Sequence, residues 1–313
     1  MAASATSHDA EHANVPSSDS LSRRRFLART GTLATAALSA PHPAIAAEKN
    51  APPTASPAPA LIDTNAYLGR WPFRRTALDT GEALRDKLRQ HQVGEAWVGH
   101  LDALLHKNLS AVNARLVEEC QTLDPTLFRP VGAVHPGLPG WREDLRRCVE
   151  EHGMRAIRLH PNYHGYALDD PAAVDLLRSA AEHDLLVQIP VILEEERTLH
   201  PLVTVPPVDT APLGGLVADI PGLRVQLLNA FRTLRGLALA SLAGRGIHFD
   251  IAMLEGMEGV ANLIRQIPAE QVCFGSYAPV FYYESNLLKL RESVLSEEHA
   301  LAVRSGNARA LLG

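Results

Sequence analysis

Short runs of aliphatic and β-branched residues alternate with longer stretches of helical hydrophobic spacing from Leu61 to the end of the chain. This alternation is typical of repeated βα units, in which an amphipathic helix follows each buried strand. The pattern predicts eight strands, at Leu61–Asn65, Ala96–His100, Arg129–Val134, Arg155–His160, Leu185–Val191, Arg224–Asn229, Ile247–Ile251 and Val272–Ser276. It predicts amphipathic helices at Thr80–His91, Ser110–Leu123, Gly140–His152, Pro171–His183, Leu234–Ala243 and Gly256–Ile267, and Glu297–Leu312 closes the chain.

The number and spacing of these units predict one α/β domain over residues 61–313, a (β/α)8 TIM barrel. Such barrels usually need about 250 residues. A doubly wound open sheet is the alternative fold, and it would place a glycine-rich phosphate loop after the first strand. The segment that follows here, DTNAYLG at residues 63–69, has no such loop. The barrel is therefore the expected fold.

The first part of the chain does not continue this pattern. Residues 22–27 read SRRRFL, which is similar to the twin-arginine export signature, and an apolar stretch at residues 30–40 is too short to span a bilayer. The small residues around Ala46 fit a signal-peptidase site. We therefore expect residues 1–46 to be a twin-arginine-type signal peptide and residues 47–60 to be a linker rich in proline and alanine. The mature protein would be periplasmic or extracellular, with no stable membrane span.

Composition narrows the range of partners. The formal net charge is -5, and no stripe of basic residues interleaved with aromatics follows the linker, so nucleic acid is not expected as a partner. A small molecule is expected instead. The three cysteines, Cys120, Cys148 and Cys273, lack the spacing of a zinc site or a disulfide framework, so they are predicted to be buried core thiols.

Polar side chains occur at the carboxyl ends of the predicted strands, where a (β/α)8 barrel builds its active site. This pattern is better explained by a polar pocket than by packing alone. The residues that we expect to bind substrate there are Asn65, Tyr67, Arg158, Asn162, Tyr163, His164, Asn229 and Tyr277. Residues 71–73 (WPF) are interpreted as an apolar wall or lid, and the charged run at 194–197 (EEER) as a loop that could close over the pocket.

Proton transfer is assigned to histidine because imidazole titrates near neutral pH. His160 and His135 are the predicted acid–base groups, and Asp250 is predicted to orient one of the histidines. Alternation along the strand places Arg158 and His160 on the same side, and an arginine there could hold a substrate carboxylate. The alternative is that Arg158 is structural and pairs with a buried carboxylate such as Asp63 or Asp250.

Several segments resemble the amidohydrolase-related family of barrel hydrolases, lactonases and metal-dependent decarboxylases. They are LIDTNAYLGRWPFRR (61–75), RAIRLHPNYHGYALDDP (155–171), VCFGSYAP (272–279) and SGNARALLG (305–313). The resemblance implies the same barrel fold and a metal-dependent activity. In that family the first strand ends in Asp-Thr-His-x-His, where this chain has Asn65 and Tyr67. The strand-8 aspartate is replaced by Tyr277, and the strand-5 histidine is missing from a strand that reads VQIP at 187–190.

These replacements leave asparagine, tyrosine and glutamine where zinc prefers imidazole, thiolate or carboxylate ligands. No metal site and no cofactor are therefore predicted, although the family resemblance by itself would imply a divalent ion such as zinc. The expected function is an exported hydrolase that acts on an ester, lactone or amide bond of a small anionic or polar substrate. The alternatives are a non-catalytic small-molecule-binding barrel and a decarboxylase or other lyase.

Overall fold

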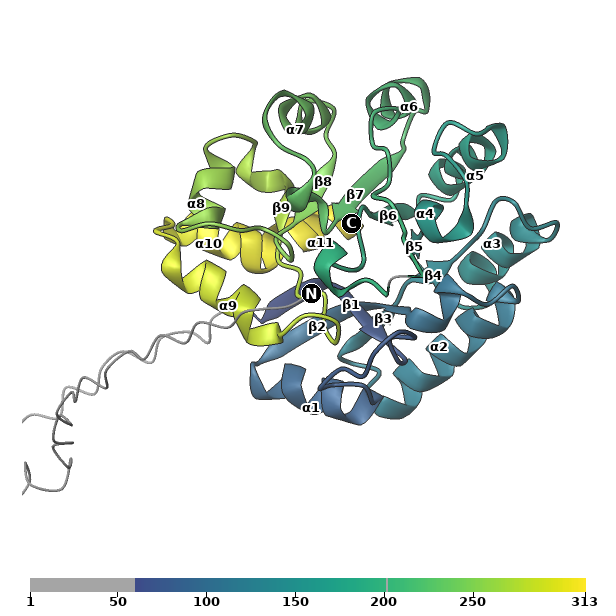
Figure 1. The fold of residues 1–313 in the computed structure, drawn as a ribbon, viewed down its shortest axis with the longest axis horizontal. Helices are drawn as coiled ribbons and strands as arrows, with labels where there is room; N and C mark the ends of the chain where they lie inside the picture. The colour runs from purple at the N-terminus through teal and green to yellow at the C-terminus, as the bar shows by residue number, and fades with distance from the viewer. Residues whose placement is uncertain (1–59, 201) are drawn as a thin grey trace, which may run out of the picture. The chain divides into compact units, whose positions relative to one another are not determined.

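The computed structural model describes residues 60–200 and 202–313. The predicted signal peptide, and the predicted linker as far as residue 59, lie outside the described residues. In Figure 1 the strands lie in the middle of the domain and the helices surround them.

The strands follow one another in sequence order and every pair is parallel. They form a sheet β1-β2-β3 and a sheet β4-β5-β6-β7-β8-β9. Their bounds are β1 Leu61–Leu68, β2 Val93–His100, β3 Phe128–Pro130, β4 Gly132–Ala133, β5 Ala156–Arg158, β6 Leu186–Pro190, β7 Arg224–Leu228, β8 His248–Asp250 and β9 Val272–Cys273. Each of the eight predicted strands overlaps one of these, with β3 and β4 as the two parts of the third.

Backbone hydrogen bonds outside the named strands join the two sheets into a barrel. The N–H of Val131, between β3 and β4, donates to the carbonyl of Val98 at 2.8 Å. At the other junction, the N–H of Thr64 donates to Phe274 at 3.0 Å and the N–H of Tyr67 donates to Ala278 at 2.9 Å. The segment after β9 therefore lies beside β1, which confirms the predicted TIM-barrel fold.

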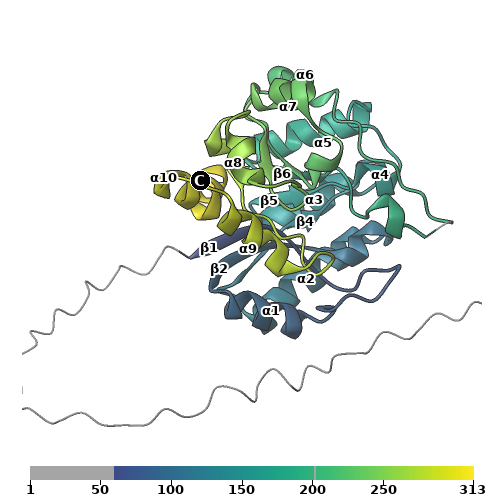
Figure 2. The same cartoon turned by 60° about the vertical axis from the view of Figure 1, so that its left-hand side comes forward.

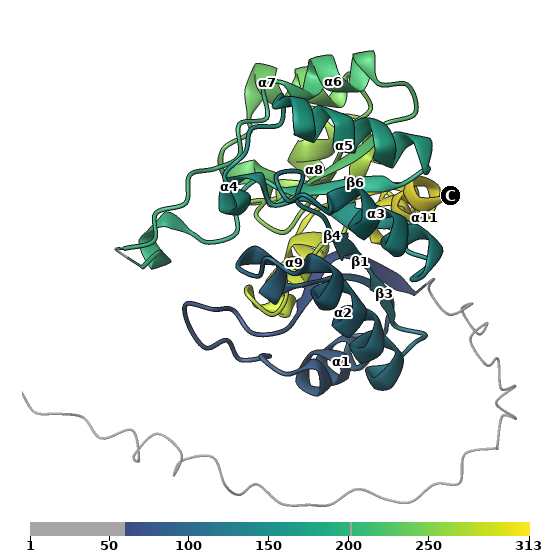
Figure 3. The same cartoon turned by 90° about the vertical axis from the view of Figure 1, so that its right-hand side faces the viewer.

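The helices cover the outside of the strands, as the turned views in Figures 2 and 3 show. Their bounds are α1 Gly81–Gln90, α2 Leu109–Leu123, α3 Trp141–Glu150, α4 Pro161–His164, α5 Pro171–Glu182, α6 Leu213–Asp219, α7 Gly236–Ala243, α8 Gly259–Ile264, α9 Tyr283–Glu292, α10 Glu297–Leu301 and α11 Asn307–Leu312. Helices pack in this way through a buried stripe. In α1, for example, Leu84 and Leu88 are one helical turn apart and both are buried against the strands.

An apolar layer fills the amino-terminal end of the barrel. It combines one side chain from each of six strands or strand junctions with two from α11, namely Ile62, Trp97, Val131, Ala156, Leu186, Cys273, Ala308 and Leu311. A hollow of about 810 Å³ opens at this end, and Trp97, Phe128 and Arg155 are among its lining residues. All three cysteines are buried free thiols, as the sequence predicts.

Strand β1 contains an irregularity that matters for the site. Asp63 pairs with Ala96 and Ala66 pairs with Val98, so three steps along β1 match two steps along β2. Such a bulge changes the direction of the side chains that follow it. As a result Thr64 and Asn65, which are neighbours in sequence, both find hydrogen-bond partners on other strands.

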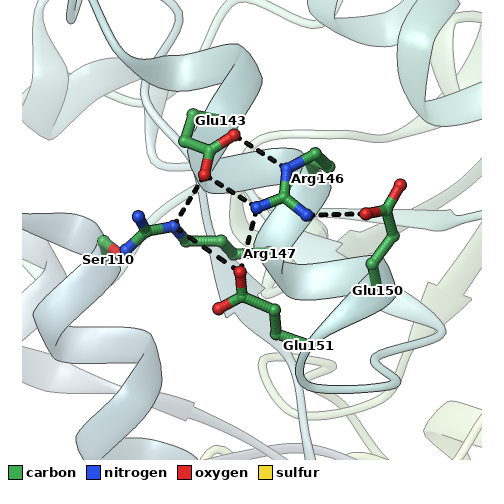
Figure 4. A network of polar contacts seen from close by, with 6 residues as sticks. All are labelled: Ser110, Glu143, Arg146, Arg147, Glu150 and Glu151. Carbon is green, nitrogen blue, oxygen red and sulfur yellow. Dashed lines mark hydrogen bonds and ion pairs between the residues drawn. The ribbon is translucent and has the colours of Figure 1, made fainter.

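Figure 4 shows a network of charged side chains on α3, and on Glu151 directly after it, that reaches Ser110 on α2. Arg146 pairs with Glu143, Glu150 and Glu151, and Arg147 bonds to both Glu143 and the hydroxyl of Ser110. The two arginines hold the pKa of Glu143 at about 2. These side chains are partly exposed, so water screens the pairs and each stabilises the fold only slightly.

Candidate functional site at the carboxyl end of the barrel

Arg158 is fully buried and forms the centre of a polar layer above the apolar one. Its Nε and Nη2 donate to Gln188 Oε1 at 3.0 and 2.7 Å, and its Nη1 donates to the Ala66 carbonyl at 2.9 Å. The amide of Gln188 continues to Gln226 at 2.8 Å, and Gln226 donates to the Thr64 hydroxyl at 2.9 Å. The layer thus links β5, β6, β7 and β1.

Both interpretations of Arg158 from the sequence need correction. The guanidinium does point inward with His160, but protein acceptors already bind its Nε, Nη1 and Nη2, so it is not placed to read a substrate anion. The acceptors are a neutral amide and backbone carbonyls rather than Asp63 or Asp250. Its charge lies 4.3 Å from the centre of the Tyr67 ring, a cation–π contact.

Asn65, Asn229 and Asp250 form a second buried network nearer the mouth. The Asn65 amide donates to Asp250 Oδ2 at 2.6 Å and to Asn229 Oδ1 at 2.9 Å. The N–H of Asn229 donates to Asp250 Oδ1 at 2.9 Å. Asp250 therefore binds two asparagines and does not orient a histidine as predicted. Burial raises its pKa to about 6, and the hydrogen bonds from Asn229 and Asn65 oppose that rise.

Asp63 lies beside this network and is also fully buried. It accepts hydrogen bonds from the Ser276 hydroxyl at 2.5 Å, from the Ser276 N–H at 2.9 Å and from the Asn65 N–H at 3.1 Å. Burial outweighs these bonds and raises the pKa of Asp63 to about 7. These contacts fix the segment after β9 against β1, which makes Asp63 a positioning residue.

Tyr67 and His160 meet above the polar layer. The Tyr67 hydroxyl lies 3.4 Å from His160 Nε2, and Tyr277 packs edge-on against Tyr67 at 5.8 Å between ring centres. The pKa of His160 is well below its usual value, chiefly because of burial and also because of His164 and Arg158. His160 is therefore a neutral imidazole at pH 7.

Two further imidazoles extend from His160 toward the loops after β4 and β5. His164 lies 5.6 Å from His160 and stacks on His135 at 4.4 Å between ring centres, with the two planes 14° apart. Burial lowers the pKa of His164 to about 4, although its hydrogen bond to the Ala103 carbonyl opposes that shift. His135 is half-buried, and its Nδ1 accepts the N–H of Gly137 at 3.1 Å. The three predicted histidines thus form one neutral cluster.

The rim of the mouth joins the loop after β1 to the loops after β5, β6 and β9. The Trp71 ring packs edge-on against Phe73 at 5.7 Å and Tyr163 at 6.5 Å. Arg74 pairs with Glu194 at 3.0 Å. The Tyr277 hydroxyl donates to the Leu193 carbonyl. The segment predicted to be an apolar wall is therefore packed against the rim, next to an ion pair.

Several buried polar atoms near the mouth have no hydrogen-bond partner within the described part of the chain. They are Asn65 Oδ1, Trp71 Nε1, His160 Nδ1, His164 Nδ1 and the Tyr166 hydroxyl. Buried polar groups are normally paired with protein or water. The unpaired nitrogens of His160 and of the neighbouring His164 are therefore available to bind water or a polar ligand. Tyr277 and Asn229 also have positive φ angles of 58° and 56°, a strained backbone that is common at functional sites.

Two other candidate residues are placed differently. Asn162 donates to the Pro206 carbonyl at 3.0 Å, so it ties the loop after β5 to the long loop after β6 rather than facing His160. Tyr163 packs on Trp71 at the rim. Sequence reasoning did not select Gln226, Arg74 or Thr64. Of these three, only Gln226 had a signal in the sequence: it is a polar residue inside a strand that was predicted to be buried.

The side chains at the family's ligand positions do not fit a zinc or manganese ion. Asn65 turns its N–H₂ group toward Asp250, both oxygens of Asp250 accept hydrogen bonds, and Tyr277 donates to a carbonyl. Gln188 is bound to Arg158, whose positive charge would repel a dication. Within residues 60–200 and 202–313, no three His, Cys, Asp or Glu side chains are grouped closely enough to hold a metal.

The closed barrel of parallel strands places this chain in the class of TIM-barrel proteins, and its polar side chains lie at the carboxyl ends of the strands, where such barrels build their ligand sites. Within that class, a family profile described as Amidohydrolase matches residues 70–313. The chain belongs to the amidohydrolase family, which confirms the resemblance found in the sequence.

Several solved structures share the barrel fold. One is 2,6-dihydroxybenzoate decarboxylase from Rhizobium, with a TM-score of 0.62 and 14% identity over 81% of this chain and 98% of that one. Another is a dihydroxybenzoic acid decarboxylase from a Polaromonas species with bound manganese and 2-nitroresorcinol, with a TM-score of 0.62 and 14% identity over 81% of this chain and 96% of that one.

A third is 5-carboxyvanillate decarboxylase from Novosphingobium aromaticivorans with bound manganese, with a TM-score of 0.62 and 12% identity over 81% of this chain and 97% of that one. At these identities the likeness shows the fold alone. No curated protein sequence matches the chain. Across residues 60–200 and 202–313, each helix is too short or too polar to cross a bilayer.

Proposed function

We propose that this chain is a hydrolase of a small anionic or polar molecule and that it uses His160 with Tyr67 in place of a metal. The observation that carries the proposal is the contact between the Tyr67 hydroxyl and His160 Nε2, in a mouth where His160 Nδ1 is buried and unpartnered in the described chain. If Nε2 donates its proton to the Tyr67 oxygen, Nδ1 keeps its lone pair. Nδ1 can then take a proton from a water molecule that attacks the carbonyl carbon.

The depressed pKa of His160 supports this role over a wide pH range. A neutral imidazole is the form that accepts a proton, and burial keeps His160 neutral well below pH 6.5. Hydrolysis should therefore not decline near pH 6.5, as it would with an exposed catalytic histidine. A pH–rate profile whose acid limb lies near pH 6.5 would contradict the assignment.

The test is hydrolysis of a panel of aryl esters and lactones by the wild type and two substituted proteins, with and without a chelator. His160→Ala should lower the rate by about 10²- to 10⁴-fold, because it removes a proton-transfer group. Tyr67→Phe should also lower it, while keeping the ring over Arg158. His152→Ala, in the hollow at the opposite end of the barrel, is the matched control. Full activity of His160→Ala, or its loss in chelator, would refute the proposal.

Decarboxylation is the second candidate function, and the three decarboxylases of the same fold are the observation that favours it. Loss of CO2 from an aromatic acid needs a proton at the carbon, and the Tyr67–His160 pair could supply it. Incubation with 2,6-dihydroxybenzoate and measurement of released CO2 separates this reaction from hydrolysis. Saturable binding without turnover in either assay would instead assign the chain as a non-catalytic binding barrel.

Export from the cytoplasm is part of the same proposal. The SRRRFL run, the short apolar stretch and the small residues near Ala46 support export of the folded protein through the twin-arginine pathway. The substrate would then be met in the periplasm or outside the cell.

A further inference from the structure

The buried guanidinium of Arg158 is bound to protein acceptors, so an anionic ligand at the mouth needs a different cation. Arg74 is placed to supply it. Its side chain is 38% exposed, and it lies between the loops after β1, β6 and β9 because Nε contacts Glu194 and Nη2 contacts the Val280 carbonyl at 3.3 Å. Among the described residues, Arg74 Nη1 has no hydrogen-bond partner.

The partner of Arg74 is unusual for a surface ion pair. Glu194 lies in the loop after β6, which ends at Pro190. Its side chain is only 2% exposed, and its Oε1 also accepts a hydrogen bond from the Thr198 hydroxyl at 2.8 Å. Burial of a carboxylate is costly unless the charge is compensated. Arg74 therefore holds an internal carboxylate at the mouth in the same way that it would hold the carboxylate of a ligand.

The surroundings of this ion pair favour a flat ligand. Trp71 and Phe73 precede Arg74 in the same loop, and Tyr163 packs on Trp71 from the other side of the rim. Trp71 Nε1 is a buried donor with no partner among the described residues, so an acceptor atom beside the ring would satisfy it. The hydroxyl of Tyr163, which lies near Glu194, can also donate to an anion.

We propose that Arg74 binds the carboxylate of a small aromatic acid and that Glu194 takes the place of that carboxylate when no ligand is present. The inference rests on the proposed function, because it names the substrate class of the same site. Ligand entry would exchange one carboxylate for another on Arg74. Glu194 would then act as an internal competitor that keeps affinity moderate.

The experiment titrates benzoate, and separately its neutral analogue benzamide, into the full chain, with calorimetry and tryptophan fluorescence as readouts. Glu194→Gln removes the competing charge and should tighten benzoate binding by about tenfold. Arg74→Gln should abolish benzoate binding, and Arg74→Lys should restore part of it. Benzamide binding should be the same in all of these proteins.

Two neighbouring substitutions serve as matched controls. Arg75→Gln changes the adjacent arginine, which is 80% exposed and pairs with Asp79, and Glu195→Gln changes the adjacent carboxylate. Neither should alter benzoate affinity. Equal binding of benzoate by wild type and Arg74→Gln would overturn the inference, as would the absence of benzoate binding by Glu194→Gln. Because no turnover is measured, these results are independent of whether His160 catalyses a reaction.

Discussion

The guanidinium of Arg158 is a full positive charge inside the barrel, and its hydrogen-bond acceptors are the neutral Gln188 amide and backbone carbonyls. Moving a charge out of water is expensive, so every acceptor around it contributes to keeping the charge in place. Gly99 has a part in this arrangement, because a Cβ there would come within 3.1 Å of Arg158 Nη1 and 3.2 Å of the Tyr67 ring. Neighbouring strands thus supply both the space for the Arg158 guanidinium and its hydrogen-bond acceptors.

Asp63 leads to a prediction about pH. Burial raises its pKa to about 7 in the folded protein, from an ordinary value of 3.8. The folded state thus binds this proton more tightly than the unfolded state does. Proton binding therefore stabilises the folded protein fully below about pH 4, and this stabilisation is lost as the pH rises through 7. Asp63→Asn stays neutral at every pH. At pH 8 the free energy of unfolding of Asp63→Asn should exceed that of the wild type by on the order of 2 kcal/mol.

Urea denaturation at a series of pH values between 4 and 8 measures this difference. The advantage of Asp63→Asn should shrink toward pH 4, since the wild-type carboxyl is then protonated. Asp169→Asn, at an exposed position, is the control and should follow the wild type. A variant that is less stable than the wild type at pH 8 would show that Asp63 is needed as an anion.

Part of the residue-level picture could be predicted from the sequence. Strand alternation correctly put Arg158 and His160 on the same side, and the polar residues at strand ends do gather at one end of the barrel. The partners of those residues could not be predicted, because Gln188, Gln226 and Thr64 come from three other strands. Contacts between strands depend on their relative heights in the barrel, which hydrophobic periodicity does not encode.

At the scale of elements, the approach of β9 to β1 and β8 leads to a second prediction. A Cβ on Gly275 would lie 2.6 Å from Asp250 Oδ2, 2.8 Å from Asp250 Cβ and 3.0 Å from Asn65 Cβ. Gly275→Ala should therefore push apart the strand ends that hold the Asn65–Asp250 network. We expect thermal unfolding to show a loss of about 1–3 kcal/mol.

A glycine in a helix gives the opposite expectation and serves as the control. Gly215, in α6, has open space where a Cβ would be added. Gly215→Ala should stabilise the protein by about 0.5–1 kcal/mol, because alanine has less freedom to lose on folding. If both substitutions destabilise the protein equally, the tight contact at Gly275 is not the cause.

The bulge in β1 explains why the end of this strand was predicted wrongly. Alternation ended the first strand at Asn65, but the structure continues it to Leu68. The irregular pairing between Asp63 and Ala66 breaks the two-residue period, so Thr64 and Asn65 both have interior partners. A pattern that assumes a constant period cannot find such a strand end.

At the scale of the whole molecule, the barrel itself was predictable, since eight repeats of strand and helix leave few other arrangements. Closure could not be read from the sequence in the same way. It depends on the bonds from Thr64 and Tyr67 to the segment after β9, more than 200 residues later in the chain. The loop after β6, which carries Glu194, was predicted to be near the pocket, and its link to Arg74 emerged only from the fold.

Export is a prediction about the complete chain. A reporter fused after Ala47 should leave the cytoplasm, and replacing both Arg23 and Arg24 by lysine should retain it there. Cell fractionation of the two fusions measures the effect. A single substitution at Arg25, outside the twin pair, is the comparison. Unchanged export of the double variant would remove the twin-arginine assignment without affecting the proposed chemistry.

The buried guanidinium described above has a consequence for how the protein matures. Arg158 lies directly beneath Tyr67, which stands where the family carries a metal-binding histidine. Its positive charge is made on the ribosome as part of the chain, so every folded copy holds it in equal amount. A charge that belongs to the chain needs no loading step after synthesis, whereas a bound metal ion does.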